Sequence, residues 1–292
     1  MSKINTNKLI LGTAQLDGNY GISNIIDKNH KKNAYKTLET AFKNGIRNID
    51  TAPGYESEKI IGKFISAHGL SNNVNIFTKI PTFNKKKNLE KFVLNSLESS
   101  LRNLKTDIHT LFIHNTKDID LFKKNIFFFK NLKNNFPIKN LGFSIYCKKE
   151  IYQTSKLGFE PVYQVPFNIL DQKFLRLKLN KKKIVARSIF LQGLLINKKI
   201  KKNKLTLSLR KSHKKYHDFL RELNINPLGL QLSFINNIKQ INKFIIGVDN
   251  HYQLNEIINC NLWKKVDTKY IYKINSFFSK VNIDPRKWKN TK

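Results

Sequence analysis

Four side chains that can move protons or orient a carbonyl group stand at or near the ends of short apolar runs. Asp50, Lys79 and His114 each come at the end of such a run, and Tyr55 lies in the segment after Asp50. A tyrosine phenol, with a reference pKa near ~10, is a weak acid at neutral pH unless a neighbouring ammonium stabilises the phenolate. Lys79 can supply that ammonium, and a carboxylate paired with it keeps its charge in place. The set suits protonation of the alkoxide that forms when a hydride reaches a carbonyl carbon.

Each of the four residues has a structural interpretation when it is taken alone. Asp50 can cap the loop after its strand, and Lys79 can extend from a strand end to solvent. Tyr55 can be a surface aromatic, and His114 a hydrogen-bonded core histidine. Because all four stand at the same end of neighbouring units, we favour the joint interpretation, in which His114 orients a substrate carbonyl in a shared pocket.

Eight apolar, β-rich runs recur along the chain and must position these side chains. They span residues 9–14, 46–49, 74–78, 110–113, 141–143, 162–165, 184–186 and 244–248. Most are almost continuously apolar, as strands buried on both faces are. Strands that alternate with helices pair in parallel, so eight units predict an α/β fold, a (β/α)8 TIM barrel, as one domain over residues 1–292. No Gly-x-Gly-x-x-Gly follows the first run, which argues against a Rossmann fold.

Apolar stripes at helical spacing fill the intervening segments. The first comprises Ala34, Leu38, Ala41 and Phe42, and others begin at Leu94, Tyr216 and Leu228. We expect these stripes to pack against the barrel. Gly45, just after the first stripe, is expected to end its helix in a left-handed conformation. The lysine-rich segment 196–211, in the longest gap between runs, is expected to be a surface insertion.

The charge balance is strongly basic. The 292 residues include 54 Lys+Arg and 20 Asp+Glu, for a formal net charge of +34. Such an excess raises nucleic acid or anionic lipid as a partner. The densest lysine clusters, at 85–87, 181–183 and 198–202, lack the interleaved aromatics that stack on bases. We therefore expect a solvated basic surface that favours anionic ligands, with nucleic-acid binding as the weaker alternative.

The chain shows no targeting or membrane signal. No stretch approaches the roughly 20 apolar residues that cross a bilayer, and the apolar run at 9–11 is too short for a signal sequence. Cys147 and Cys260 are far apart and match no disulfide framework or metal-ligand spacing. We expect a cytoplasmic protein without a metal site, as a monomer or weak homo-oligomer.

The segment 48–62 resembles the signature of the aldo/keto reductase family, with Asp50-Thr51-Ala52, then Tyr55, Ser57-Glu58 and Gly62. Residues 77–79 and 111–114 are similar to the family's lysine and histidine strands. The resemblance extends over about residues 9–259. It implies an NAD(P)H-dependent oxidoreductase that acts on an aldehyde or ketone. In that family Tyr55 would be the general acid, Lys79 and Asp50 its tuning pair, and His114 the residue that orients the substrate.

The resemblance also implies where a nicotinamide cofactor, expected to be NADPH with NADH as the alternative, would bind. The implied cofactor contacts are Gly12, Thr13, Ser144, Gln164, Arg187, Ser188, Gly247, Asn250, Gln253 and Glu256. Ser144 and Gln164 correspond to the residues that hold the carboxamide, and Ser188 belongs to the loop that contacts the phosphates. The helix after the eighth run would present its N-terminus to the anionic adenosine end.

Several positions depart from the family pattern. Arg187 stands where many members have an aromatic residue that stacks on the nicotinamide, and Ile145 replaces a common asparagine. Gln253 stands where many members use an arginine to hold the 2′-phosphate, and Gly247 replaces a frequent lysine. These last two departures leave NADH open as the cofactor.

Residues 164–171 and 187–195 are similar to members that accompany genes of surface-polysaccharide and sugar biosynthesis, as are the opening segments 11–15 and 20–24 to a bacterial branch of the family. A sugar-like carbonyl compound is the substrate that this similarity implies. Two other hypotheses stay open. One is a non-catalytic NAD(P)H-sensing barrel that regulates a partner. The other is a basic nucleic-acid-binding protein, which predicts strongly salt-dependent binding.

Overall fold

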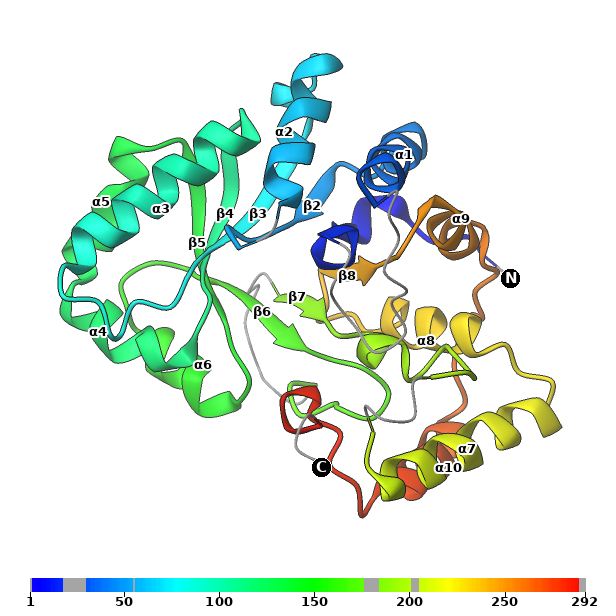
Figure 1. Ribbon diagram of the computed structural model, residues 1–292. Coiled ribbons are helices and arrows are strands. Elements are labelled where there is room, and N and C mark those ends of the chain that lie inside the picture. The colour runs from blue at the N-terminus through cyan, green and yellow to red at the C-terminus, as the bar shows by residue number, and fades with distance from the viewer. Residues whose placement is uncertain (1, 18–29, 55, 176–183, 201–204, 289–292) are drawn as a thin grey trace.

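Eight parallel strands close into a barrel in chain order, and β8 pairs back onto β1 (Figure 1). The computed structural model describes residues 2–17, 30–54, 56–175, 184–200 and 205–288. The strands are β1 (Leu9–Gly12), β2 (Asn48–Asp50), β3 (Asn75–Ile80), β4 (Ile108–Ile113), β5 (Ile138–Ser144), β6 (Val162–Pro166), β7 (Ile184–Arg187) and β8 (Lys243–Gly247). The expected (β/α)8 barrel is thereby confirmed. Each expected run overlaps one strand, and Lys79 lies inside β3 rather than after it.

Helices surround the barrel on its outer side (Figure 1). They are α1 (His30–Lys43), α2 (Ser57–Ala67), α3 (Leu89–Leu104), α4 (Ile119–Lys124), α5 (Ile126–Asn135), α6 (Lys148–Thr154), α7 (Leu207–Glu222), α8 (Pro227–Asn236), α9 (His251–Asn259) and α10 (Thr268–Phe278). The first expected stripe is buried on α1, and Gly45 follows that helix with a φ of +79°. Because this left-handed conformation suits glycine, the chain can turn there from α1 into β2.

The expectation of a surface insertion at 196–211 is wrong for part of that segment. Leu205 and Leu209 are buried, and α7 begins at Leu207. Thr206 caps this helix, since its hydroxyl accepts a hydrogen bond from the Leu209 amide. The high lysine content hid two widely spaced apolar residues that anchor the helix. Residues 201–204, and the lysine cluster 181–183, lie outside the described residues.

A small apolar layer fills the barrel interior directly below the predicted catalytic residues. It consists of Ile10, Phe77, Phe112, Val162 and Val185, one from each of five strands. Side chains two residues apart on a strand point to the same face. The residues two positions further along these strands are Gly12, Lys79, His114, Gln164 and Arg187. The packed layer therefore supports a second, polar layer at the carboxyl ends of the strands, where barrel enzymes hold their active sites.

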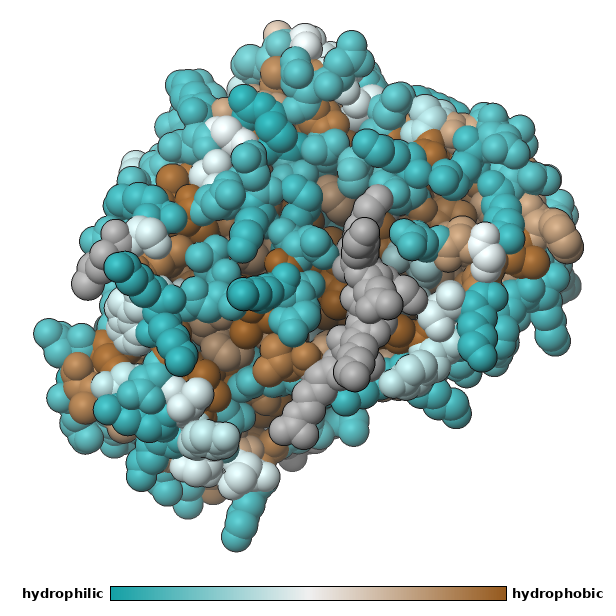
Figure 2. Space-filling model, turned by 180° about the vertical axis from the view of Figure 1, so that it is seen from behind, coloured by the Kyte–Doolittle hydropathy of each residue, from teal (hydrophilic) through white to brown (hydrophobic). Residues whose placement is uncertain are grey.

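The outer surface is mainly hydrophilic on the face shown in Figure 2, with apolar side chains in small groups between polar ones. Within the described residues, none of the helices combines the length and apolar character needed to span a bilayer. Cys147 is an exposed free thiol, and Cys260 is a partly buried one. The expected cytoplasmic location and oligomeric state stay predictions.

Candidate active site

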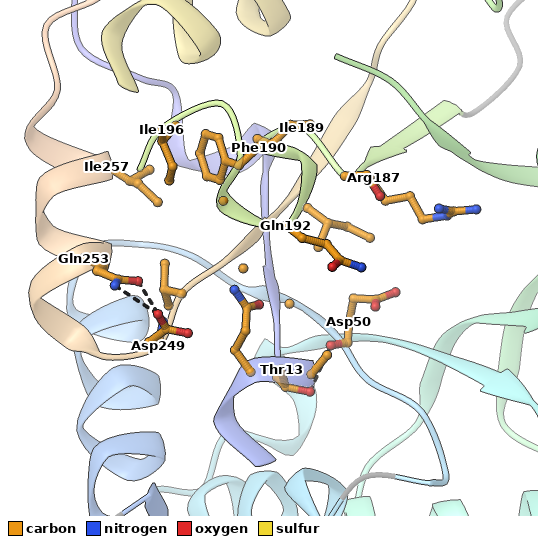
Figure 3. A pocket seen from close by; sticks show the side chains of 18 of the residues that line it. Thr13, Asp50, Arg187, Ile189, Phe190, Gln192, Ile196, Asp249, Gln253 and Ile257 are labelled. Carbon is orange, nitrogen blue, oxygen red and sulfur yellow. Dashed lines mark hydrogen bonds between the residues drawn. The ribbon is translucent and has the colours of Figure 1, made fainter. Parts of the chain in front are cut away.

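One elongated pocket opens at the carboxyl ends of the strands (Figure 3). It is lined by Gly12, Thr13, Ala14, Gln15, Asp50, Lys79, His114, Ser144, Tyr146, Gln164, Arg187, Ser188, Ile189, Phe190, Gln192, Gly193, Ile196, Asn197, Leu228, Ile245, Gly247, Val248, Asp249, Gln253, Glu256 and Ile257. Three of the four predicted catalytic residues and nine of the ten predicted cofactor contacts are in this set. The structure therefore brings together residues from the first strand to the last.

Asp50 and Lys79 form a buried ion pair at the base of the pocket. The Lys79 Nζ lies 2.7 Å from the Asp50 Oδ1 and donates a second hydrogen bond to the Thr51 carbonyl at 2.7 Å. The other carboxylate oxygen, Asp50 Oδ2, accepts a hydrogen bond of 2.7 Å from the Gln164 Nε2. Both oxygens of Asp50 thus have a donor from a different strand. A buried charge pair with these extra hydrogen bonds is fixed in position.

His114 follows β4 and reaches the same pocket. The side chain of His114 is exposed to solvent, although the surrounding protein displaces much of the water around its ring. This burial, together with the positive charges of Lys79 and Arg187, lowers the pKa of His114 to about 4, and Asp50 opposes the shift. The imidazole is therefore neutral at physiological pH and carries one N–H donor.

Tyr55 lies outside the described residues, and its role stays a prediction. The segment that contains Tyr55 connects β2, which ends at Asp50, to α2, which begins at Ser57. The start of α2 is tied to the pocket. The Ser57 hydroxyl lies 3.1 Å from the Thr13 hydroxyl and 3.2 Å from that of Thr51. The segment that carries Tyr55 therefore starts and ends at residues anchored beside the Asp50–Lys79 pair.

The predicted carboxamide-binding residues are connected to the catalytic pair. The Ser144 hydroxyl, at the end of β5, is 3.5 Å from the Gln164 Oε1, while the Gln164 Nε2 holds Asp50. Gln164 therefore has a task that the sequence did not reveal: it orients the carboxylate. Thr13 also has a structural contact, since its hydroxyl donates to the Asp50 backbone carbonyl at 3.1 Å.

Arg187 packs against a protein aromatic ring rather than lying free in the pocket. Its guanidinium lies 4.3 Å from the centre of the Tyr146 ring. The guanidinium of Arg286, close to the C-terminal end of the described chain, lies 3.6 Å from the centre of the same ring. Asp284 holds Arg286 through several short hydrogen bonds. Sequence analysis missed Tyr146 and Arg286, because no local pattern indicates that the C-terminal segment returns to the pocket.

The far end of the pocket is formed by the β8–α9 turn. Asn250 does not line the pocket; it caps α9, where its side chain accepts a hydrogen bond of 3.0 Å from the Gln253 amide. The Gln253 side chain accepts from the Asp249 amide at 2.9 Å and donates to the Asp249 Oδ2 at 3.2 Å. The other carboxylate oxygen, Asp249 Oδ1, is buried and has no hydrogen-bond partner among the residues that the structure describes. Burial raises the pKa of Asp249, and the Gln253 hydrogen bond opposes this.

The loop after β7 forms one wall of the pocket and has an unusual backbone. Ser188, Leu191 and Gln192 all have positive φ values, between 50° and 57°. Such conformations are costly for residues other than glycine and persist where the surroundings hold them.

Three buried side chains of α7 provide that support by donating to backbone carbonyls of this loop. The Tyr216 hydroxyl donates to Leu195 at 2.9 Å, and the Nε2 atoms of His213 and His217 lie 2.9 and 3.3 Å from the carbonyls of Asn197 and Leu194. Because carbonyls only accept, both imidazoles must carry their proton on Nε2. Burial is the main reason that the pKa of His217 is lowered to about 4, which keeps this ring neutral.

Comparisons with known proteins agree with this fold. Aldo-keto reductase YhdN of Bacillus subtilis (strain 168) is 26% identical over 152 residues, which cover 49% of this chain and 46% of that relative's length. The solved structure of the glycerol dehydrogenase AKR11B4 from Gluconobacter oxydans superposes with a TM-score of 0.69 at 17% identity, and covers 98% of this chain and 93% of that one. This second likeness shows the fold. The sequence profile of the aldo/keto reductase family matches residues 8–277. The chain therefore belongs to the aldo/keto reductase family, whose members in general use NAD(P)H.

Proposed function

We propose that this protein is an oxidoreductase that reduces an aldehyde or ketone with NAD(P)H, and that Tyr55 donates the proton. The observation that carries the proposal is the buried Asp50–Lys79 pair at the base of a pocket that also contains His114. Family membership supports the reaction class, since the residues of the family signature are those that form the pair.

The ion pair suits a proton donor in its neighbourhood. Lys79 is held by two oxygen acceptors, the Asp50 carboxylate and the Thr51 carbonyl, so its ammonium stays in one place. A fixed positive charge stabilises a phenolate and makes the phenol a stronger acid. In our proposal Tyr55 gives its proton to the developing alkoxide, and Lys79 stabilises the phenolate that remains.

His114 would orient the substrate. A neutral imidazole can donate its N–H to a carbonyl oxygen without competing with Tyr55 as an acid. The low pKa of His114 keeps the ring in that form near neutral pH.

The pocket fits a dinucleotide. Ser144 and Gln164 offer amide and hydroxyl groups near the catalytic pair, and the unpartnered Asp249 Oδ1 at the other end can accept a hydrogen bond from a ligand hydroxyl. When bound, the reduced nicotinamide supplies the hydride. The sequence indicates NADPH, with NADH as the alternative, and a sugar-like carbonyl compound as substrate. The anionic cofactor also suits the basic charge of the chain.

The Tyr55→Phe variant tests the proposal. Oxidation of NADH and NADPH should be followed with a panel of aldehydes and ketones, including sugars. We expect turnover in wild type and a loss of roughly 10²–10⁴-fold in Tyr55→Phe, with dinucleotide binding retained. Tyr272→Phe, at an exposed position on α10, is the matched control and should behave as wild type. Full activity in Tyr55→Phe would contradict the mechanism. Binding without turnover on the whole panel would favour the cofactor-sensing alternative.

A further inference from the structure

The two ends of the pocket differ in charge. Figure 3 shows Asp50 and Arg187 on one side and Asp249 with Gln253 on the other. In the proposed function the nicotinamide must lie beside Asp50 and Lys79, where the proton is delivered. The adenosine end of an extended dinucleotide then lies along the β8–α9 side of the pocket, which is lined by Gly247, Asp249, Gln253, Glu256 and Ile257.

Part of the N-terminal end of α9 is already satisfied by its own side chains. A helix N-terminus attracts phosphate because its first amide groups lack partners. Here Asn250 takes the amide of Gln253, and the Gln253 side chain takes the amide of Asp249. A phosphate group would have to displace these contacts to gain the amides of Gln253 and Asp249.

The charged side chains that line this end are acidic. Asp249 and Glu256 are carboxylates, and no lysine or arginine from the described part of the chain lines the β8–α9 side. His251, on the first turn of α9, stacks on Tyr252 and is not among the lining residues. A 2′-phosphate would therefore meet two negative groups and no described positive one. Glu256 is exposed and its field is screened by water, so Asp249, which is more buried, contributes most of the repulsion.

One carboxylate oxygen of Asp249 lacks a hydrogen-bond donor among the described residues. Its Oδ1 is buried and unpartnered, while its Oδ2 is held by the Gln253 Nε2. A carboxylate that is oriented in this way accepts a hydrogen bond from a hydroxyl, and it repels a phosphate at the same position.

We propose that this protein prefers NADH to NADPH, and that Asp249 is the residue that sets the preference. It accepts a hydrogen bond from the 2′-hydroxyl of the adenosine ribose and excludes a 2′-phosphate. The inference rests on the proposed function, because it takes the position of the nicotinamide from the catalytic pair.

Binding of the two reduced dinucleotides to the full chain, measured separately by isothermal titration calorimetry at one ionic strength, tests the inference. We expect NADH to bind wild type more tightly by roughly tenfold or more, because the 2′-phosphate of NADPH would bring about −1.5 to −2 charge close to a partly buried carboxylate. The Asp249→Asn variant keeps the shape of the side chain and its contact with Gln253, and removes the charge. This variant should lower the ratio of the Kd for NADPH to the Kd for NADH by about tenfold, mainly through tighter NADPH binding.

Two further variants sharpen the assignment. Asp120→Asn makes the same charge change on α4, at an exposed residue that does not line the pocket, and should leave the ratio as in wild type. Asp249→Asn combined with Gln253→Arg adds a guanidinium and should reverse the preference. Equal or tighter binding of NADPH by wild type overturns the inference alone, as does an unchanged ratio in Asp249→Asn. If neither dinucleotide binds wild type, the proposed function fails as well.

Discussion

Two of the carboxylates that line the pocket, Asp50 and Asp249, have opposite sets of contacts. Asp50 has a donor on each oxygen: Lys79 on one and Gln164 on the other, both at 2.7 Å. Asp249 has Gln253 on one oxygen and, within the described part of the chain, no partner on the other. The first carboxylate is fully committed to the protein and positions a cation. In our proposal, the second offers its unpartnered oxygen to the cofactor.

The difference arises from where each residue lies in the barrel. Asp50 ends β2 in the closed sheet, where the adjacent strand β3 supplies Lys79 and the non-adjacent strand β6 supplies Gln164. Asp249 follows β8 in a turn, and its contacts come from the next helix alone. The strands fix Asp50 through both of its oxygens, whereas the turn leaves the buried Asp249 Oδ1 with no partner among the described residues.

Removing the cation of the committed end should have the largest effect. Lys79→Met leaves Asp50 buried with half of its partners, which destabilises a protein by up to about 3–5 kcal/mol. We expect kcat/KM to fall by roughly 10²–10⁴-fold, since the acid loses the charge that tunes it. Steady-state kinetics and urea unfolding measure the two effects. In Lys214→Met, which breaks an exposed ion pair with Asp218 on α7, stability should change by no more than about 1 kcal/mol. If Lys79→Met resembled this control, the pair would have no special role.

Gln164→Leu should have a smaller effect at the same end. The Asp50 Oδ2 would lose its donor, which costs about 1–3 kcal/mol for a buried polar group. We expect roughly a tenfold loss in kcat/KM, or about 1.4 kcal/mol of barrier. Gln164→Glu should be worse than Gln164→Leu, because it places a second carboxylate beside Asp50. The opposite order would show that Gln164 does not hold the carboxylate.

The pKa of His114 reports the electrostatic environment at the catalytic end of the pocket. Proton NMR should show His114 titrating at about 4. Removal of the Lys79 charge in Lys79→Met should raise that pKa, because the imidazolium would lose a repulsive neighbour and keep Asp50. Titration of wild-type His114 near its ordinary value of 6.5 would mean that its surroundings are much wetter than the structure indicates.

At the β8–α9 end, the charged form of Asp249 should lower the free energy of unfolding by a small amount, whereas a salt-bridged acid raises it. Because burial raises the pKa of Asp249, the folded state binds its proton more tightly than the unfolded state does. The charged form therefore costs stability once the pH rises above the unfolded pKa, and the cost is complete above the folded pKa. Asp249→Asn should gain stability relative to wild type at pH 7 compared with pH 3, as measured by urea unfolding at both values. A constant difference between the two pH values would contradict the shift.

The sequence predicted the committed end far better than the β8–α9 end. Apolar runs indicate buried strands, and a polar residue at the end of a run marks the carboxyl face of the barrel. The sequence alone therefore predicts Asp50, Lys79 and His114 at that face. The contacts of Gln164 with Asp50 and of Arg286 with Tyr146 join residues that are distant in the chain, and no periodicity encodes them. The unpartnered oxygen of Asp249 depends on side-chain orientation in a turn. The segment 196–211 misled, because its many lysines outweighed the few apolar residues that pack.

A comparison of the Asp50→Asn and Asp249→Asn variants tests the account most directly. For each variant, turnover and the affinities for NADH and NADPH are measured. The account predicts that Asp50→Asn loses most of its turnover and binds both dinucleotides in the wild-type ratio. It predicts that Asp249→Asn keeps catalysing reduction and shifts the ratio toward NADPH. If both variants lost turnover and altered the ratio to the same degree, the two ends would not be separate in function, and the central claim would be wrong.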